Sequence, residues 1–259
     1  INGEIIIKHI DSGIIIEFHE EEHTGENPNL EIISSDNTTH NYSLYRKEKN
    51  VLSSQIININ DIKRISIIYN TQPEIVYSKD VFTALPSKNK NNINFNGYNL
   101  NLSSDSFYNN TLIICSEEKE YKLNKKFTEI SKPIKIEPNN IPFKKEIKIE
   151  YNIPNCDNCA LYKYSYEDEK WNYLNTNNNL EVLNTKITSG GTFCILSETE
   201  QPIIKNLKPR FNTRYKQKDF KKITFNIDDR LSGINPYSID IKLDGKKIFY
   251  DYIKYRNLV

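Results

Sequence analysis

The stretch Glu146-Ile147-Lys148-Ile149-Glu150-Tyr151 alternates charged and apolar side chains at every position. Successive side chains of an extended strand point to opposite faces, so such alternation is typical of a half-buried β-strand. The same pattern, complete or in large part, recurs at residues 5–8, 13–18, 65–69, 223–227 and 238–243. No segment of ten or more residues carries the apolar stripe of an amphipathic helix.

Clusters of Asn, Asp, Gly, Pro and Ser separate these strands, as at residues 25–29, 94–97 and 175–179. Asn and Gly tolerate left-handed backbone, which turns require. The sequence therefore predicts an all-β fold of tandem immunoglobulin/fibronectin-like β-sandwich domains.

Two polar tracts, residues 84–92 and 197–202, interrupt the alternation. They predict domains at residues 1–88, 89–198 and 199–259. The last domain offers only three or four strands, so we expect an incomplete Ig-like sandwich, either truncated or completed by strands from elsewhere.

The composition argues against several classes of partner. The 35 basic and 34 acidic residues leave a net charge of +1, so no global field favours nucleic acid or an anionic membrane surface. No apolar run approaches the roughly 20 residues of a membrane-spanning helix, which predicts no membrane insertion. The chain begins at Ile1, contains no Met and shows no signal-peptide pattern, so we expect an internal fragment or a mature piece.

Residues 18–25, FHEEEHTG, match the H-E-x-x-H pattern of zinc peptidases. In those enzymes a helix brings the two histidines, here His19 and His23, onto one face, with the intervening Glu20 as general base. Strand formers precede the motif and Gly25 and Pro28 follow it, which disfavours a helix. In a strand the two imidazoles would lie about 13 Å apart, too far to share one ion. The motif is therefore only a weak metal candidate.

Two other groups of residues are candidate metal or redox sites. Cys156 and Cys159 form a C-x-x-C motif, for which a local disulfide, a pair of free thiols and half of a zinc site remain open. Asp228 and Asp229 could offer carboxylates to calcium, although an Asp that caps its own turn is the more ordinary interpretation.

An aromatic row is the best candidate for a binding surface. Tyr162, Tyr164 and Tyr166 would share one strand face, with Trp171 and Tyr173 close in sequence. Such a row could stack on a glycan, but it is more commonly core or cross-strand packing.

Several motifs recur in the order found in one known group of proteins. They are LNL (100–102) with SFYNNTL (106–112), IEP (136–138) with KEIKI (145–149), ALYKY (160–164) with KWNYL (170–174), GGTFCIL (190–196) with QPII (201–204), and IDDRLSGI (227–234) with IKLDGK (241–246). From about residue 95 to 259 the chain thus resembles the β-sandwich accessory region that follows the catalytic domain in secreted bacterial lysostaphin/LytM-type zinc endopeptidases.

The resemblance carries over no catalytic residue. The endopeptidases of that family use H-x-x-x-D and H-x-H zinc motifs, and the four histidines here, at 9, 19, 23 and 40, form neither. The resemblance implies an extracytoplasmic, non-catalytic accessory or spacer region without a cofactor. Its partners would be an upstream catalytic domain of the same chain and a cell-envelope polymer or protein.

Two other functions compete with this expectation. One is a cell-surface adhesin-like or glycan-binding module that uses the aromatic row. The other is a zinc hydrolase built on His19, Glu20 and His23.

Overall fold

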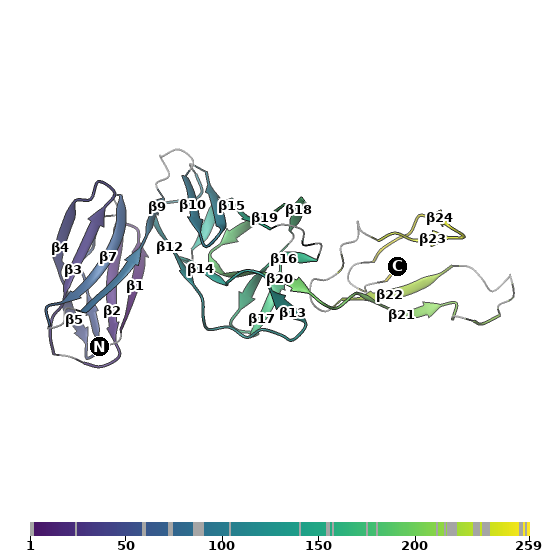
Figure 1. The fold of residues 1–259 in the computed structure, drawn as a ribbon, viewed down its shortest axis with the longest axis horizontal. Coiled ribbons are helices and arrows are strands. Elements are labelled where there is room, and N and C mark those ends of the chain that lie inside the picture. Colours follow the sequence, from purple (N-terminus) through teal and green to yellow (C-terminus); the bar gives the residue numbers. More distant parts are fainter. Residues whose placement is uncertain are drawn as a thin grey trace.

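A computed structural model describes residues 3–259 except 24, 59–60, 72–74, 85–90, 104, 140, 154–155, 157, 175, 180, 211, 215, 217–221, 230–233, 235–238, 254–255 and 257. The described chain is all-β, and every strand pairing in it is antiparallel (Figure 1). The prediction of tandem β-sandwiches is confirmed. The finer assignment to an immunoglobulin or fibronectin type remains a prediction.

The N-terminal unit is a sandwich of two four-stranded sheets. The first sheet has the order β1 (Gly3–Ile10), β2 (Gly13–Glu20), β6 (Val51–Ser53) and β5 (Tyr45–Glu48). The second has the order β4 (Thr39–Ser43), β3 (Asn29–Ser34), β7 (Ile62–Tyr69) and β8 (Ile75–Asp80). Alternate residues of both sheets, such as Ile16 and Phe18 of β2 and Ile65 and Ile67 of β7, meet in one buried cluster, the N-terminal core.

The second unit packs a five-stranded sheet on a larger one. The five-stranded sheet has the order β10 (Asn91–Phe95), β11 (Tyr98–Leu102), β15 (Pro142–Asn152), β19 (Val182–Ser189) and β18 (Asn177–Asn179). The larger sheet runs β17 (Lys170–Tyr173), β16 (Cys159–Ser165), β20 (Gly191–Glu198), β14 (Ile134–Glu137), β12 (Thr111–Glu117) and β9 (Phe82–Ala84), with β13 (Phe127–Glu129) also paired to β20.

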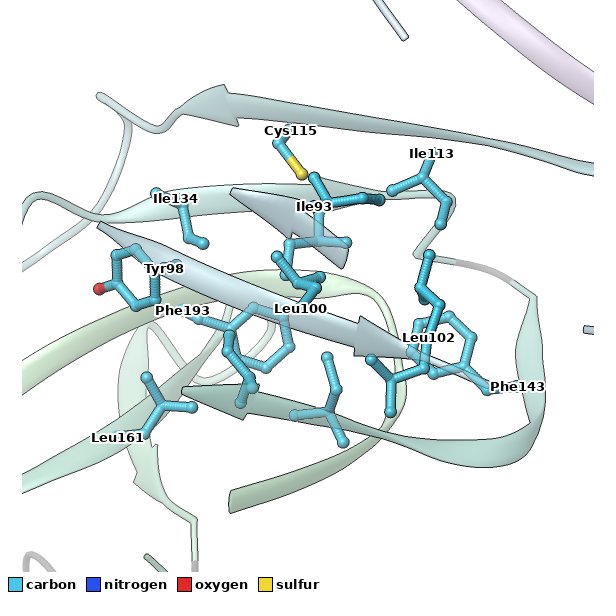
Figure 2. Close-up of a cluster of buried hydrophobic side chains, with 14 of the residues drawn as sticks. Ile93, Tyr98, Leu100, Leu102, Ile113, Cys115, Ile134, Phe143, Leu161 and Phe193 are labelled. Atoms are coloured by element: carbon cyan, nitrogen blue, oxygen red, sulfur yellow. The ribbon is translucent and has the colours of Figure 1, made fainter. Parts of the chain in front are cut away.

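The core between these two sheets, the second core, explains the alternation in residues 146–151. Ile147 and Ile149 of β15 are buried in it, and Tyr151 packs against its edge. Leu100 on the neighbouring strand β11 and Phe193 of the opposite sheet point into the same cluster (Figure 2). The charged residues of β15 face away from this core, as the period of two requires.

The C-terminal part consists of two small sheets. One pairs β21 (Ile203–Lys208) with β22 (Thr224–Asp228), and the other pairs β23 (Lys242–Leu243) with β24 (Lys246–Lys247). All six residues of β21 are exposed, including Ile203 and Ile204. Among the residues of this part that the structure describes, Ile227 is the buried apolar one. These strands lie at the opposite end of the molecule from the N-terminal sandwich (Figure 1).

Candidate functional site

The H-E-x-x-H motif lies at the end of a strand. Strand β2 runs through His19 and Glu20 and stops there, so the helix that a zinc peptidase needs is not formed. The two histidines contact different carboxylates: His19 Nε2 lies 3.2 Å from Glu17 Oε2, and His23 Nδ1 lies 3.8 Å from Glu20 Oε2. They are therefore not arranged to share one metal ion.

Glu20 is part of a buried polar cluster that closes this end of the N-terminal sandwich. Its carboxylate accepts hydrogen bonds from the hydroxyl of the buried Tyr69 and, at 2.8 Å, from Nη1 of Arg46. Arg46 also donates to the backbone carbonyls of Lys49 at 2.7 Å and Glu26 at 3.1 Å. The arrangement is that of a structural clamp: a buried charge is stabilised by a paired guanidinium and by hydrogen bonds.

Glu17 lies on the opposite face of β2 and is covered by cations. Its carboxylate is 2.7 Å from Lys8 Nζ and 3.1 Å from Lys47 Nζ, besides the contact with His19. The hydrogen bond from Lys8 is the main cause that lowers the pKa of Glu17 to about 2. A carboxyl group with such a pKa stays ionised near neutral pH and is unsuited to act as a general acid.

The other metal candidates do not assemble into a site. Asp228 ends β22 and forms an ion pair with Lys205 across the small sheet. The downstream part of the Asp228–Gly233 loop lies outside the described residues. Within the parts of the chain that the structure describes, no group of three or more His, Cys, Asp or Glu residues could hold a metal ion.

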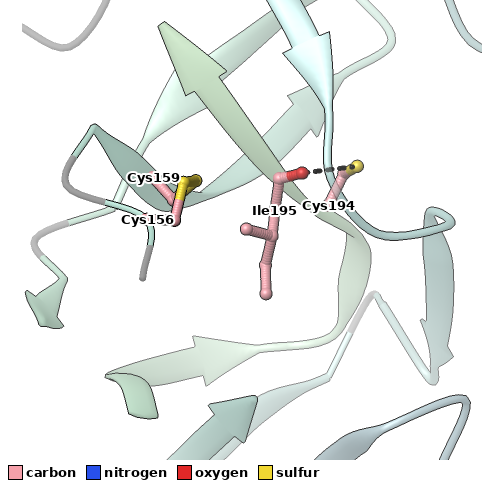
Figure 3. Close-up of a disulfide and its surroundings, with 4 residues drawn as sticks. All are labelled: Cys156, Cys159, Cys194 and Ile195. Carbon is pink, nitrogen blue, oxygen red and sulfur yellow. Dashed lines mark hydrogen bonds between the residues drawn. A yellow bond between two sulfur atoms is a disulfide. The ribbon is translucent and has the colours of Figure 1, made fainter. Parts of the chain in front are cut away.

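The four cysteines fall into two kinds. Cys156 and Cys159 are joined by a disulfide at the start of β16 (Figure 3), which corresponds to one of the three states that the sequence left open. Cys115 and Cys194 are free and buried, and burial raises the pKa of each thiol to about 12. Both thiols therefore stay protonated and unreactive in the folded protein.

The aromatic row is mostly core, which corrects its assignment as a binding surface. Tyr162, Tyr164 and Trp171 are 1%, 6% and 5% exposed, Tyr173 is half-buried, and only Tyr166, at 49%, is open to solvent. Tyr162 and Tyr164 share one face of β16 and pair with Tyr173 and Trp171 of β17. The Tyr166 ring lies just beyond the end of β16 and packs edge-on against Tyr164, with ring centroids 4.9 Å apart. The interpretation as cross-strand packing therefore accounts for the row better than a stacking surface does.

A segment without regular structure covers these rings. Residues 118–126, the strap, run across the face of the large sheet that points away from the second core. The backbone N–H of Lys122 donates to the Tyr164 hydroxyl at 3.0 Å, and Trp171 Nε1 donates to the Lys122 carbonyl at 3.1 Å. The Tyr121 ring packs edge-on against Trp171 with centroids 5.7 Å apart. Sequence reasoning missed the strap because its charged residues resemble an ordinary loop.

The most distinctive arrangement is the junction between the two sandwiches, at β12. Leu112 and Ile114 belong to the N-terminal core, whereas Ile113 and Cys115 belong to the second core. One strand thus has both faces buried, each against a different unit. The run Leu112-Ile113-Ile114-Cys115 carried the signal for this, because unbroken apolar runs are typical of strands buried on both faces.

Two further contacts reinforce the junction. Strand β9, which follows the last strand of the N-terminal sandwich, pairs with β12 in the register Thr111–Ala84, Leu112–Thr83 and Ile113–Phe82. In addition, the backbone N–H of Leu112 donates to Nε2 of His9 at 3.0 Å. The predicted domain boundary at residues 88/89 stays a prediction. Ala84, which precedes this boundary, lies in the second core, and Leu112 and Ile114, which follow it, lie in the N-terminal core. His9 had not been singled out in the sequence, and no local pattern there indicates its role.

Comparison with known proteins identifies no family for this chain. No protein-family model matches the sequence. A search of curated proteins likewise finds no match. Within the described residues there is no helix long and apolar enough to cross a membrane.

Proposed function

We propose that this chain is a non-catalytic spacer region of an exported bacterial protein, in which the first two sandwiches form one rigid unit. The observation that carries the proposal is β12, whose alternate side chains are buried in two different cores. A connection made only of flexible linker would let the units reorient freely, whereas burial on both faces of a shared strand couples their orientation.

The wider context extends the same proposal. On the resemblance described above, the parent protein would be a cell-wall metallopeptidase whose catalytic domain lies outside residues 1–259. The spacer would then set the distance or orientation between that domain and a cell-envelope polymer or protein. The separate carboxylate partners of His19 and His23 support a non-catalytic role for the present chain.

Rigidity can be measured directly. Spin labels at the exposed His40 of β4 and Lys186 of β19 would report the distance between the two units by pulsed electron paramagnetic resonance. We expect a single narrow distance distribution at neutral pH. A broad distribution in the unmodified chain would refute the rigid spacer.

A matched pair of variants sharpens this test. Leu112 and Leu183 are both fully or almost fully buried leucines, but Leu112 lies at the junction and Leu183 lies in the second core. Leu112→Ala should broaden the distribution because it opens a cavity where the units meet. Leu183→Ala should leave its width unchanged.

Two measurements address the competing functions. A zinc hydrolase would carry stoichiometric zinc that is lost in a His19→Ala, His23→Ala double variant, and would release soluble fragments from purified peptidoglycan; we expect neither. A glycan-binding module would have to use the exposed Tyr166 and the edge of Tyr173, because the other rings of the row are buried. Glycan-array binding that is lost in Tyr166→Ala would favour that alternative.

A further inference from the structure

The hydrogen bond between His9 and Leu112 depends on the protonation state of the imidazole. An amide N–H can only donate, so the Nε2 atom 3.0 Å away must offer a lone pair. The ring is therefore neutral, with its proton on Nδ1. A doubly protonated imidazolium would present a second N–H to the amide, and the bond would be lost.

His9 lies at the junction, where the side chain is partly buried and the bond to Leu112 is partly shielded from water. Residues 5, 7 and 9 share one face of β1, and Ile5 and Ile7 of this face contribute to the N-terminal core. His9 pairs with Ile14 at the end of the β1–β2 hairpin that is nearest to β12. Burial lowers the pKa of His9 below its ordinary value of 6.5.

Among the described residues of the strands around His9, no carboxylate faces the imidazole to stabilise its charged form. Toward the N-terminal core, β12 presents Leu112 and Ile114, and β9 contains no ionisable residue. On the inward face of β8, the titratable groups are Tyr77 and the cation Lys79. On the inward face of β2, the only charge is Glu20, which pairs with the opposite end of β1, about 20 Å along the strand.

We propose that His9 makes the attachment of the N-terminal sandwich to the second sandwich sensitive to pH, strengthening it while the imidazole is neutral and weakening it when the ring takes up a proton. This inference rests on the proposed function as a rigid spacer and adds a condition to it. The coupling would be strong near neutral pH and would weaken in a mildly acidic environment.

The direction and the size of the pH effect on the junction follow from proton linkage. Because burial disfavours the charged ring, the separated state of the junction binds the proton more readily, so acid favours separation. While the pH stays above the pKa of the attached state, the equilibrium constant for opening is multiplied by about 1 + 10^(6.5 − pH), where 6.5 is the ordinary pKa of His. The factor is about 1.1 at pH 7.5 and reaches at most about 30 at pH 5.0, the limit for an attached state that binds no proton.

Amide hydrogen exchange of the full chain, resolved by NMR, tests the proposal at its central atom. After correction for the intrinsic exchange rate, the protection factor of the Leu112 amide should fall by up to about 30-fold between pH 7.5 and pH 5.0. The amide of Ile195, which donates to Ser131 Oγ inside the second sandwich, is the internal reference and should keep its protection. A scalar coupling across the N–H···N bond at pH 7.5 would verify the acceptor.

Two substitutions separate His9 from other causes. In His9→Gln, a side-chain amide oxygen can take the place of Nε2 as acceptor but cannot titrate near neutral pH, so the protection of Leu112 should become independent of pH. His40→Gln alters an exposed histidine of β4 and should leave the pH dependence intact. A drop that persists in His9→Gln, or that is equal at Leu112 and Ile195, would overturn the proposal, as would constant protection in the unmodified chain.

The outcomes also distinguish this inference from the function on which it rests. A broad distance distribution between labelled sandwiches at pH 7.5 contradicts the spacer whatever the behaviour of His9. A narrow distribution at pH 7.5 together with pH-independent protection of Leu112 leaves the spacer standing and contradicts only the role of His9.

Discussion

Two neighbouring isoleucines of β12 should destabilise different halves of the protein when they are shortened. Ile113 is 2% exposed and lies in the second core, whereas Ile114 is 4% exposed and lies in the N-terminal core. Ile113→Ala and Ile114→Ala remove the same three carbon atoms from adjacent positions of the same strand. Their chemistry, burial and local backbone are therefore matched, and only the core that each side chain fills differs.

The expected loss in the free energy of unfolding follows from the burial of the two side chains. Each buried methylene contributes about 0.8 kcal/mol, so the loss of three carbons should cost roughly 2.5 kcal/mol before the cavity is counted. The residual cavity brings the usual cost of such a change to about 2–5 kcal/mol. Both variants should thus lose a similar free energy of unfolding, which provides an internal control on the size of the perturbation.

Hydrogen exchange with mass spectrometry at low urea concentration would show which strands each variant destabilises. Ile114→Ala should accelerate exchange in peptides of β2 and β7, and Ile113→Ala should accelerate exchange in peptides of β15 and β19. If both variants accelerated the same peptides, or if Ile114→Ala left the N-terminal sandwich unaffected, the assignment of β12 to two cores would be wrong.

Three further predictions concern separate features. Ionised Glu17 stabilises the fold fully above pH 4.5, the ordinary pKa of Glu, and this stabilisation is lost as the pH falls toward about 2, the pKa of Glu17 in the folded protein. Lys8→Met should raise the pKa of Glu17 in an NMR titration. An unchanged pKa would contradict the ion pair. A thiol reagent should modify no cysteine in the folded, unreduced protein, two after denaturation, and all four after denaturation with reduction; any other count would contradict the disulfide or the burial of Cys115 and Cys194. Gly190→Ala should lower the free energy of unfolding by about 1–3 kcal/mol, because its Cβ would lie 2.4 Å from the backbone oxygens of Ile136 and Pro138. At Gly25 an added side chain meets no atom within 4 Å, so Gly25→Ser should cost only the strain of its φ of +74°, roughly 1 kcal/mol, in the same urea titration.

The sequence predicts the strands of this protein well because the relevant information is local. Alternation in residues 146–151 places Ile147 and Ile149 in the second core, as the structure shows. The sequence also places Tyr162 and Tyr164 on one face of a strand, as the structure shows, whereas Tyr166 lies just beyond the end of β16. The period of two fixes which side chains share a face, and this holds whatever the strand packs against.

What the sequence could not predict is what covers each face. A row of tyrosines exposed to solvent and a row covered by the strap have the same period of two in the sequence. Only the path of residues 118–126 in the folded chain shows that this row is covered. In the same way, the hydrogen bond from Leu112 to His9 joins residues 103 positions apart. No window that detects strands spans such a separation, so this contact is apparent only in the folded chain, although the apolar run of β12 indicates a strand buried on both faces.

The strap gives the protein an optical property of its own. Trp171 is the single tryptophan of the chain, and its indole N–H donates to the strap carbonyl of Lys122. Intrinsic fluorescence excited at the red edge of the indole band therefore reports one place in the molecule, the underside of that segment. Its emission wavelength and its accessibility to a collisional quencher would register any lifting of residues 118–126 without an added dye.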